Sequence, residues 1–222
     1  MVKAIYLIKR KRGLELEAFR KYWLTTHAGL ALKVPGLRKY VQSHTIESGY
    51  KKGEPVFDGI AEVWYDDTNA MRRIAELPQA RAVNGDGHNF MDMGASGLLL
   101  TREHVVKDGP IDSSMVKYVA FAKRRPEMEV EAFQTYWKDH HGPLAARIPV
   151  VRRYVQNHVL LSGYRSGLAP LYDSVAETWF EDTAAMRVSA TTPEYQAVRA
   201  DEPNFIDGGS LAFIITREHV ML

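Results

Sequence analysis

This chain is organised around the sequence Phe133-Gln134-Thr135-Tyr136-Trp137-Lys138-Asp139-His140-His141. On a helix that also includes Val130, the residues Phe133, Trp137 and His141 follow at steps of three, four and four, so they share one face. This spacing is typical of a stripe that faces a core, but its last member is an imidazole. We therefore expect His141 at the rim of the core or in a cavity.

The same stripe occurs upstream as Leu16, Phe19, Trp23 and His27, and it is part of a repeat that covers the whole chain. A shift of 114 residues aligns the first part of the two copies, one residue is inserted in the second copy before Pro170, and a shift of 115 aligns the rest. The aligned pairs include Tyr40 with Tyr154, Gln42 with Gln156, His44 with His158, Trp64 with Trp179, and Thr101-Arg102-Glu103 with Thr216-Arg217-Glu218. The chain therefore consists of two copies of one module.

We expect a first module at 1–107, a polar linker with Gly109-Pro110 at 108–114, and a second module at 115–222. Each copy predicts the order strand, helix, strand, strand, helix, strand. The expected strands are 2–9, 37–46, 57–65 and 98–105 in the first copy and 116–123, 151–160, 172–180 and 211–220 in the second. The expected helices begin near 14 and 127 and cover 68–77 and 183–190, the latter two with Asp67 and Asp182 as caps.

This element order is that of the ferredoxin-like split motif, βαββαβ. Such a module places both helices on one face of an antiparallel sheet and leaves the other face without cover. Two copies in one chain can bury those faces against each other. The sequence therefore predicts an α+β fold of two tandem ferredoxin-like modules whose antiparallel sheets pack face to face.

Composition limits the function classes. Lys and Arg number 29 against 27 Asp and Glu, a net charge of +2 that gives no argument for a nucleic-acid or acidic-membrane partner. Cysteine is absent, which excludes disulfides, thiolate nucleophiles and zinc sites built on sulfur. The first residues form an alternating strand without the apolar region of a signal peptide, and no apolar run is long enough for a bilayer. We expect a soluble cytoplasmic protein.

Several motifs of both copies together resemble one known family. These are Phe-x-x-Tyr-Trp-x-x-x-His from Phe19 and Phe133, Tyr-Val-Gln-x-His from Tyr40 and Tyr154, and the closing Thr-Arg-Glu. The pattern resembles the EthD family of dimeric α/β barrel proteins, and the resemblance extends over both halves. It implies an intramolecular version of that barrel. Relatives of this fold include cofactor-independent isomerases, polyketide cyclases and dehydratases, quinol monooxygenases and haem-binding oxygenases, so the resemblance does not fix the reaction.

The resemblance implies a ligand pocket inside each module, between its helices and its sheet. His27 and His141 would point into these pockets, and Tyr40 and Tyr154 match the strand tyrosine that acts with such a histidine in similar enzymes. A His/Tyr pair can move protons without a cofactor, because imidazole titrates near neutrality and a phenol can donate to a carbonyl. The alternative is that the histidines bind buried backbone groups and the tyrosines only pack.

Further candidates lie on the strands. Gln42, Gln156, His44 and His158 share the face of the tyrosines and form either a polar row that binds an oxygenated ligand or an exposed strand end. Trp64 and Trp179 suit core packing or a pocket wall. His140 projects about 100° away from its neighbour His141 on a helix and completes the candidate substrate-binding residues.

The two copies also differ. His140 of the second copy is Thr26 in the first, and Gly142-Pro143 is Ala28-Gly29, so the second copy is closer to the family pattern. Tyr118 aligns with Ala4, and Ala120 aligns with Tyr6. Whether both pockets work alike is therefore open.

The sequence predicts no metal site, because His140, His141 and His158 lack the spacing of zinc-binding motifs. Motifs for haem attachment, for phosphate binding and for a serine nucleophile are absent as well. A haem held by a single axial histidine has no spacing requirement, so haem stays an alternative.

We therefore expect an enzyme without cofactor, of the lyase, isomerase, cyclase or dehydratase type. It would act on an oxygenated, partly apolar ring compound from a catabolic or polyketide-type pathway. His27 with Tyr40, and His141 with Tyr154, would be the acid/base pairs. The alternatives are a haem-binding oxygenase of the same fold and a non-catalytic, metabolite-binding accessory protein. The expected partner is a small molecule, with neither nucleic acid nor membrane, and further homo-oligomerisation is left open.

Overall fold

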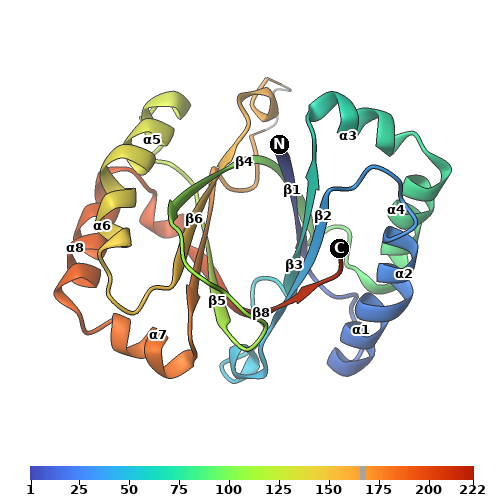
Figure 1. Cartoon of the computed structure of the whole chain (residues 1–222), viewed down its shortest axis with the longest axis horizontal. Coiled ribbons are helices and arrows are strands. Elements are labelled where there is room, and N and C mark those ends of the chain that lie inside the picture. Colours follow the sequence, from blue (N-terminus) through green and yellow to red (C-terminus); the bar gives the residue numbers. More distant parts are fainter. Residues whose placement is uncertain (166–168) are drawn as a thin grey trace. The chain divides into compact units, whose positions relative to one another are not determined.

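The computed structural model describes residues 1–165 and 169–222, and within them the chain forms two compact units (Figure 1). The first unit comprises Met1–Leu100 and Glu218–Leu222, and the second comprises Thr101–Arg217. The units therefore do not end at the module boundary, because the last strand of each module continues into the other unit. The residue that is inserted in the second copy before Pro170 falls at residues 166–168, which lie outside the described residues, or next to them. No helix in the described part of the chain has the length and apolar character needed to cross a membrane.

The first unit is built on a sheet in which β3 lies between β1 and β2, antiparallel to both. Helices α1 to α4 cover one face of this sheet (Figure 1). The chain's last residues, Met221 and Leu222, exchange backbone hydrogen bonds with Tyr40 of β2. The elements are β1 (Val2–Ile8), α1 (Leu16–Tyr22), η1 (Trp23–His27), α2 (Ala28–Ala31), β2 (Lys39–Thr45), η2 (Glu47–Tyr50), β3 (Gly59–Tyr65), α3 (Thr68–Ala75), α4 (Pro78–Phe90) and β4 (Gly97–Lys107).

The second unit repeats this arrangement, with β7 between β5 and β6. Its sheet is extended by β8, which pairs with β5, and by β4, which pairs with β6. Helices α5 to α8 cover one face (Figure 1). The elements are β5 (Val116–Ala122), α5 (Val130–Tyr136), η3 (Trp137–His141), α6 (Gly142–Ala146), β6 (Arg153–Val159), η4 (Leu161–Gly163), β7 (Ser174–Phe180), α7 (Thr183–Ser189), α8 (Pro193–Asp201), η5 (Glu202–Asn204), η6 (Gly208–Ser210) and β8 (Ala212–Val220).

The predicted fold class is confirmed. Over the described residues the strand order is β1-β3-β2-β8-β5-β7-β6-β4, closed into an antiparallel barrel, which is the topology of a dimeric α/β barrel in one chain. Asp67 and Asp182 cap their helices as expected, since each side chain accepts a hydrogen bond from the backbone N–H three residues later. The second helix of each copy is in fact two helices, because Pro78 and Pro193 each start a new one.

The apolar stripe that predicted the first helix is buried as expected, with Phe19 and Trp23 both 0% exposed. The stripe does not run on a regular α-helix, however. From Trp23 to His27, and again from Trp137 to His141, the helix takes a π-helical turn. Such turns are rare and often occur at functional sites, and here both end on the candidate histidine.

A buried ion pair lies on the opposite face of the first sheet. Lys3 Nζ is 2.6 Å from Glu62 Oε1, with both side chains at most 2% exposed. Ser43 Oγ donates to the other carboxylate oxygen of Glu62 at 3.0 Å. The second module repeats the pair as Lys117 and Glu177 at 3.0 Å. Removing one member of such a pair leaves the other charge buried without that partner, which is strongly destabilising.

We expect Lys3→Met to lower the free energy of unfolding by about 3–5 kcal/mol, because Glu62 then loses the buried ammonium group that lies 2.6 Å from its carboxylate. Lys39→Met is the matched control. Lys39 lies over the ring of Trp64 as Lys3 does, each Nζ being 4.7 Å from the ring centre, but Lys39 is exposed. We expect that control to change stability by less than about 1 kcal/mol. Urea unfolding of both variants measures the difference, and equal losses would contradict the account.

Candidate functional site

His27 ends the π-helical turn of the first module and is held by a carboxylate from α4. Its Nδ1 donates to Asp86 Oδ2 at 2.8 Å, and its ring lies 4.7 Å from the ring of Phe90. Because an ionised carboxylate only accepts hydrogen bonds, Nδ1 carries the ring hydrogen. The second nitrogen, Nε2, is therefore the basic atom of His27.

Asp86 is itself fixed by two further donors. Tyr22 Oη donates to Asp86 Oδ1 at 2.6 Å, and Asn89 Nδ2 donates to the same oxygen at 2.9 Å. Burial works to raise the pKa of Asp86, but the hydrogen bonds from Tyr22, Asn89 and His27 outweigh it and lower that pKa. Burial lowers the pKa of His27 despite the opposing effect of Asp86. The result is a neutral imidazole beside an anionic carboxylate.

A cavity of about 320 Å³ lies next to His27, inside the first module. Its wall is mostly apolar, and its polar members are Tyr6, His27, Tyr40, Tyr65 and Asn84. Among the described residues that line it there is no Lys, Arg, Asp or Glu. The cavity therefore suits an uncharged, largely apolar molecule that presents a few oxygen atoms.

Tyr40 lies in the same cavity wall, and a row of polar side chains along β2 orients it. Gln42 Nε2 donates to Tyr40 Oη at 2.7 Å and to the backbone oxygen of Trp23 at 2.9 Å. Burial raises the pKa of Tyr40 to about 12, so the phenol keeps its proton at neutral pH. Since Oη accepts the bond from Gln42, its own hydrogen is available for a ligand oxygen.

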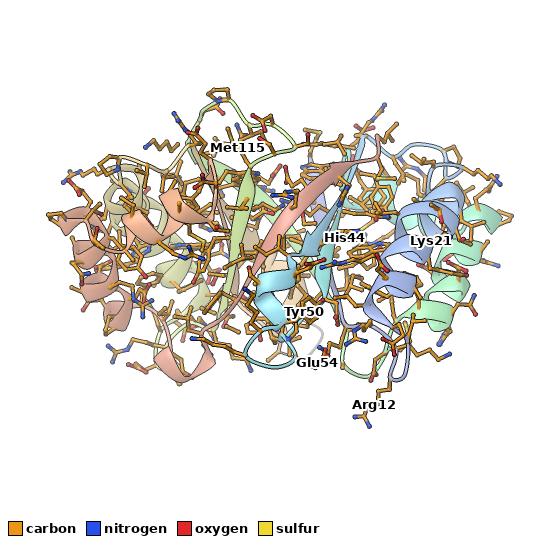
Figure 2. All side chains as sticks on the ribbon, turned by 90° about the horizontal axis from the view of Figure 1, so that it is seen from below. Arg12, Lys21, His44, Tyr50, Glu54 and Met115 are labelled. Atoms are coloured by element: carbon orange, nitrogen blue, oxygen red, sulfur yellow. The ribbon has the colours of Figure 1, made fainter. Side chains whose placement is uncertain are left out.

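His44 completes this row, and Figure 2 labels it on β2. His44 Nε2 and Gln42 Oε1 are 2.9 Å apart, and the imidazole stacks on Trp23 with the ring centres 4.2 Å apart. Burial, together with the nearby His219 and Arg20, lowers the pKa of His44 to about 3. A neutral His44 donates from Nε2 and thereby fixes the orientation of the Gln42 amide.

The second module repeats these groups. His141 Nδ1 is 2.9 Å from Asp201 Oδ2, and Tyr136 Oη donates to Asp201 Oδ1 at 2.6 Å. Burial lowers the pKa of His141 against the opposing effect of Asp201. The row along β6 is the same as in the first module: Gln156 Nε2 donates to Tyr154 Oη at 3.2 Å, and Gln156 Oε1 is 3.1 Å from His158 Nε2. Burial raises the pKa of Tyr154 to about 12, and burial with the nearby His104 and Lys138 lowers that of His158 to about 3.

The structure separates the predicted site residues into two groups. His27 and Tyr40 line the described cavity, whereas the amides of Gln42 and Gln156 and the imidazoles of His44 and His158 are buried in internal hydrogen bonds. These glutamine and histidine side chains lie on the same strand face as the tyrosines, as predicted. Their direct contact with a substrate stays a prediction.

The remaining candidates lie away from the described cavity. On β3 the cavity-lining residues are Ala61, Val63 and Tyr65, so the alternating Trp64 faces the opposite side of the sheet. Trp179 holds the same place on β7, below Lys117 at 5.1 Å. His140 is exposed and lies 5.0 Å from the ring of Tyr136. For these residues too, substrate binding stays a prediction.

Sequence reasoning missed Asp86 and Asp201, the partners of the two histidines. They lie 59 and 60 residues from His27 and His141, so no local spacing connects them. The repeat did contain a signal, because Asp86 and Asp201 are equivalent positions and each is followed three residues later by an asparagine. The presence of the same aspartate and asparagine at this spacing in both copies could have indicated a shared role.

The site residues do not match a haem site. His27 Nε2 could supply an axial nitrogen, but the described cavity wall lacks a cation for the haem propionates. Its volume of about 320 Å³ also lies at the lower end of the range for drug-sized ligands, about 300–1,000 Å³, and haem is larger than such ligands. In the described part of the chain no group of three or more His, Asp or Glu side chains could hold a metal ion.

Comparison with known proteins gives the family of the chain. The model of the EthD domain matches residues 11–94 and 125–209, one match in each module. An uncharacterized 11.0 kDa protein from the thcB-thcC intergenic region of Rhodococcus erythropolis is 30% identical over 91 residues, which are 41% of this chain and 84% of that protein.

Solved structures resemble the chain over its full length. An anthrone oxidase-like protein superposes with a TM-score of 0.68 at 10% identity, over 99% of this chain and 93% of that one. A proposed monooxygenase from Lactobacillus acidophilus superposes with a TM-score of 0.60 at 9% identity, over 99% of this chain and 94% of the other. At such low identity the likeness concerns the fold alone.

The buried histidines predict a specific loss of stability in acid. The pKa of His44 is about 3 in the folded chain and about 6.5 in the unfolded chain, so unfolding takes up a proton between these values. The stabilising effect is complete above about pH 6.5 and is lost as pH falls toward 3. We expect His44→Gln to reduce the slope of unfolding free energy against pH by about 1.4 kcal/mol per pH unit between about pH 4 and 6.

Urea unfolding at several pH values measures this slope. His158→Gln should give the same reduction, because burial affects the pKa of His158 in the same way. His88→Gln, at an exposed position, controls for the substitution itself. Curves for His44→Gln that run parallel to those of the wild type would contradict the assignment of a neutral, buried imidazole.

Proposed function

We propose that this chain, which belongs to the EthD domain family, is a cofactor-independent enzyme that moves protons on an oxygenated, largely apolar ring compound. The observation that carries the proposal is the 2.8 Å hydrogen bond from His27 Nδ1 to Asp86 Oδ2, because it positions an imidazole that lines an apolar cavity together with Tyr40. The reaction class is that of lyases, isomerases, cyclases and dehydratases. We also propose a cytoplasmic location, which the absence of cysteine supports.

His27 acts as the general base in this proposal. At neutral pH its lowered pKa leaves Nε2 unprotonated, ready to take a proton from a ring carbon or hydroxyl of the substrate. Asp86 keeps the ring in the Nδ1–H tautomer and stabilises the imidazolium that forms, because it is an anion held by Tyr22 and Asn89. The same imidazolium returns the proton at another atom or to a leaving hydroxyl group.

Tyr40 acts as the general acid. Its raised pKa keeps the phenol protonated, so Oη can donate to the carbonyl oxygen on which negative charge develops. Gln42 fixes the phenol, and the neutral His44 fixes Gln42. The two groups therefore have different roles. His27, whose pKa is lowered, accepts a proton, and Tyr40, whose pKa is raised, donates a hydrogen bond or a proton.

The cavity wall indicates the kind of substrate. Apolar side chains, among them Met71, Ile74, Val83 and Met91, face the space beside His27 and Tyr40. No fixed charge in the described wall would neutralise a carboxylate or phosphate of a ligand. A neutral ring compound with a hydroxyl or carbonyl group near His27 therefore fits best.

The first test measures turnover of a panel of hydroxylated bicyclic and tricyclic aromatic compounds by liquid chromatography and mass spectrometry. We expect His27→Gln and Asp86→Asn to lower kcat by about 10²–10⁴-fold on any compound that reacts. His88→Gln is the control, since this exposed imidazole lies outside the described cavity wall and is not a candidate site residue. For the wild type, kcat/KM should rise with pH through a value below about 6.5, the ordinary histidine pKa.

Two results would contradict the proposal. If the wild type binds these compounds without forming product, and His27→Gln changes only their affinity, the chain is a binding protein. If the purified protein develops a Soret band with added haemin, and His27→Ala abolishes this band, His27 is an axial ligand and the reaction is not cofactor-free.

A further inference from the structure

The second module keeps the hydrogen-bonded groups of the site with nearly unchanged geometry. The bond from His141 to Asp201 measures 2.9 Å, against 2.8 Å for the bond from His27 to Asp86. Both tyrosine-to-aspartate bonds measure 2.6 Å. The histidine–aspartate and tyrosine–aspartate bonds therefore do not distinguish the two modules, whereas several side chains around the adjacent space differ.

Larger side chains stand at one position of that space and at one position beside it. The repeat places Tyr195 where the first module has the cavity-lining Ala80, and Tyr118 where it has Ala4, which belongs to the buried cluster that also contains Tyr40. Tyr6 of the first cavity wall is in turn replaced by Ala120, so the tyrosine moves by two residues along the same strand face.

The contacts of the two tyrosines show where their rings lie. Tyr118 and Tyr195 pack against a buried cluster that contains Ala145, Ile148, Val151, Tyr154, Phe180 and Val198. The repeat counterparts of these six residues are Ala31, Val34, Leu37, Tyr40, Tyr65 and Val83. All six counterparts line the cavity of the first module. The rings of Tyr118 and Tyr195 therefore contact the wall that is open in the first module.

Neighbouring contacts hold these tyrosines in place. The ring of Tyr118 stacks on Phe213 with the centres 5.1 Å apart, and Phe213 takes the place of the cavity-lining Leu98. Arg199 and Glu202, which replace Asn84 and Gly87, form an ion pair of 2.5 Å. This wall is therefore charged where that of the first module is neutral.

Other replacements reduce side-chain volume. Besides Ala120 for Tyr6, Ala122 stands for Ile8, Ser189 for Ile74 and Gly208 for Met93. Ala122 is 5% exposed and belongs to a buried cluster with Phe133 and Trp137. Ser189 is 3% exposed, and its hydroxyl donates to the backbone oxygen of Met186 at 2.6 Å. These two smaller side chains therefore lie in packed surroundings.

We propose that the second module contains a closed copy of the site, in which Tyr118 and Tyr195 fill the ligand space, so that one chain binds one apolar ring ligand, in the first module. The proposal rests on the proposed function for the class of ligand and assigns that ligand to the first module. It states which module has room for the ligand and makes no statement about the reaction. The second module then contains a latent site with a complete His141–Asp201 pair. Removing the rings of Tyr118 and Tyr195 would open this site to the same class of ligand.

The chain contains its own reporters for this test. Met71, Met91 and Met93 line the first cavity, and Met186 packs against the cluster that Tyr118 and Tyr195 contact. Indole serves as a small apolar ring probe, added to protein labelled with 13C in its methionine methyl groups. In the wild type we expect the signals of the first three residues to shift with a stoichiometry of one, while that of Met186 stays in place.

The double variant Tyr118→Ala/Tyr195→Ala restores the alanines of the first module. We expect it to bind a second indole and to show a saturating shift of Met186. The reciprocal variant Ala4→Tyr/Tyr6→Ala/Ala80→Tyr gives the first module the residues of the second, and its shifts at Met71, Met91 and Met93 should be lost.

A shift of Met186 in the wild type over the same indole range, with a stoichiometry of two, would overturn the proposal. If the double variant does not fold, the indole titrations of the wild type and of the reciprocal variant still test the proposal. Because indole reports open space without any reaction, this result is independent of the turnover assay, and either proposal can fail alone.

Discussion

The hydrogen bond between His27 and Asp86 fixes the arrangement on which the site depends. It joins the π-helical turn that ends at His27 to α4, two elements far apart in sequence, beside the fully buried rings of Trp23 and Phe90. Both partners are mostly buried, so removing either would leave a polar group without its bond, at about 1–3 kcal/mol. The bond therefore stabilises the wall of the cavity and at the same time sets the tautomer of the imidazole.

A second constraint comes from the alternation of β2. Tyr40, Gln42 and His44 share one strand face, and each orients the one before it. Burial moves the two titratable groups of this row in opposite directions, raising the pKa of Tyr40 and lowering that of His44, so the row is uncharged at neutral pH. An uncharged row can lie behind an apolar cavity without the desolvation penalty of a buried ion.

The repeat and the periodicity of apolar residues were enough to predict the order of strands and helices along each module, and Asp67 and Asp182 were recognised as helix caps. The resemblance to a known family, and not the spacing, implied that His27 and Tyr40 line a pocket. Asp86 was missed because its contact with His27 depends on the packing of distant helices, which local spacing does not contain. The π-helical turns were missed since an α-helical stripe fits the same residues. The sequence showed that Tyr118 differs from Ala4, but only the contacts of the folded chain show that its ring packs on the wall of the second site. The second copy is closer to the family pattern at Gly142-Pro143, yet the described cavity belongs to the first.

His27 acts in this account as a neutral base, and Asp86 sets its tautomer. Long-range proton–nitrogen correlation spectra of protein with 15N-labelled histidine test it directly, with His27→Gln to assign the ring. We predict that His27 is neutral at pH 7 with its hydrogen on Nδ1, and that Asp86→Asn disturbs this tautomer. A ring that is protonated on both nitrogens at pH 7, or that carries its hydrogen on Nε2, would contradict the account.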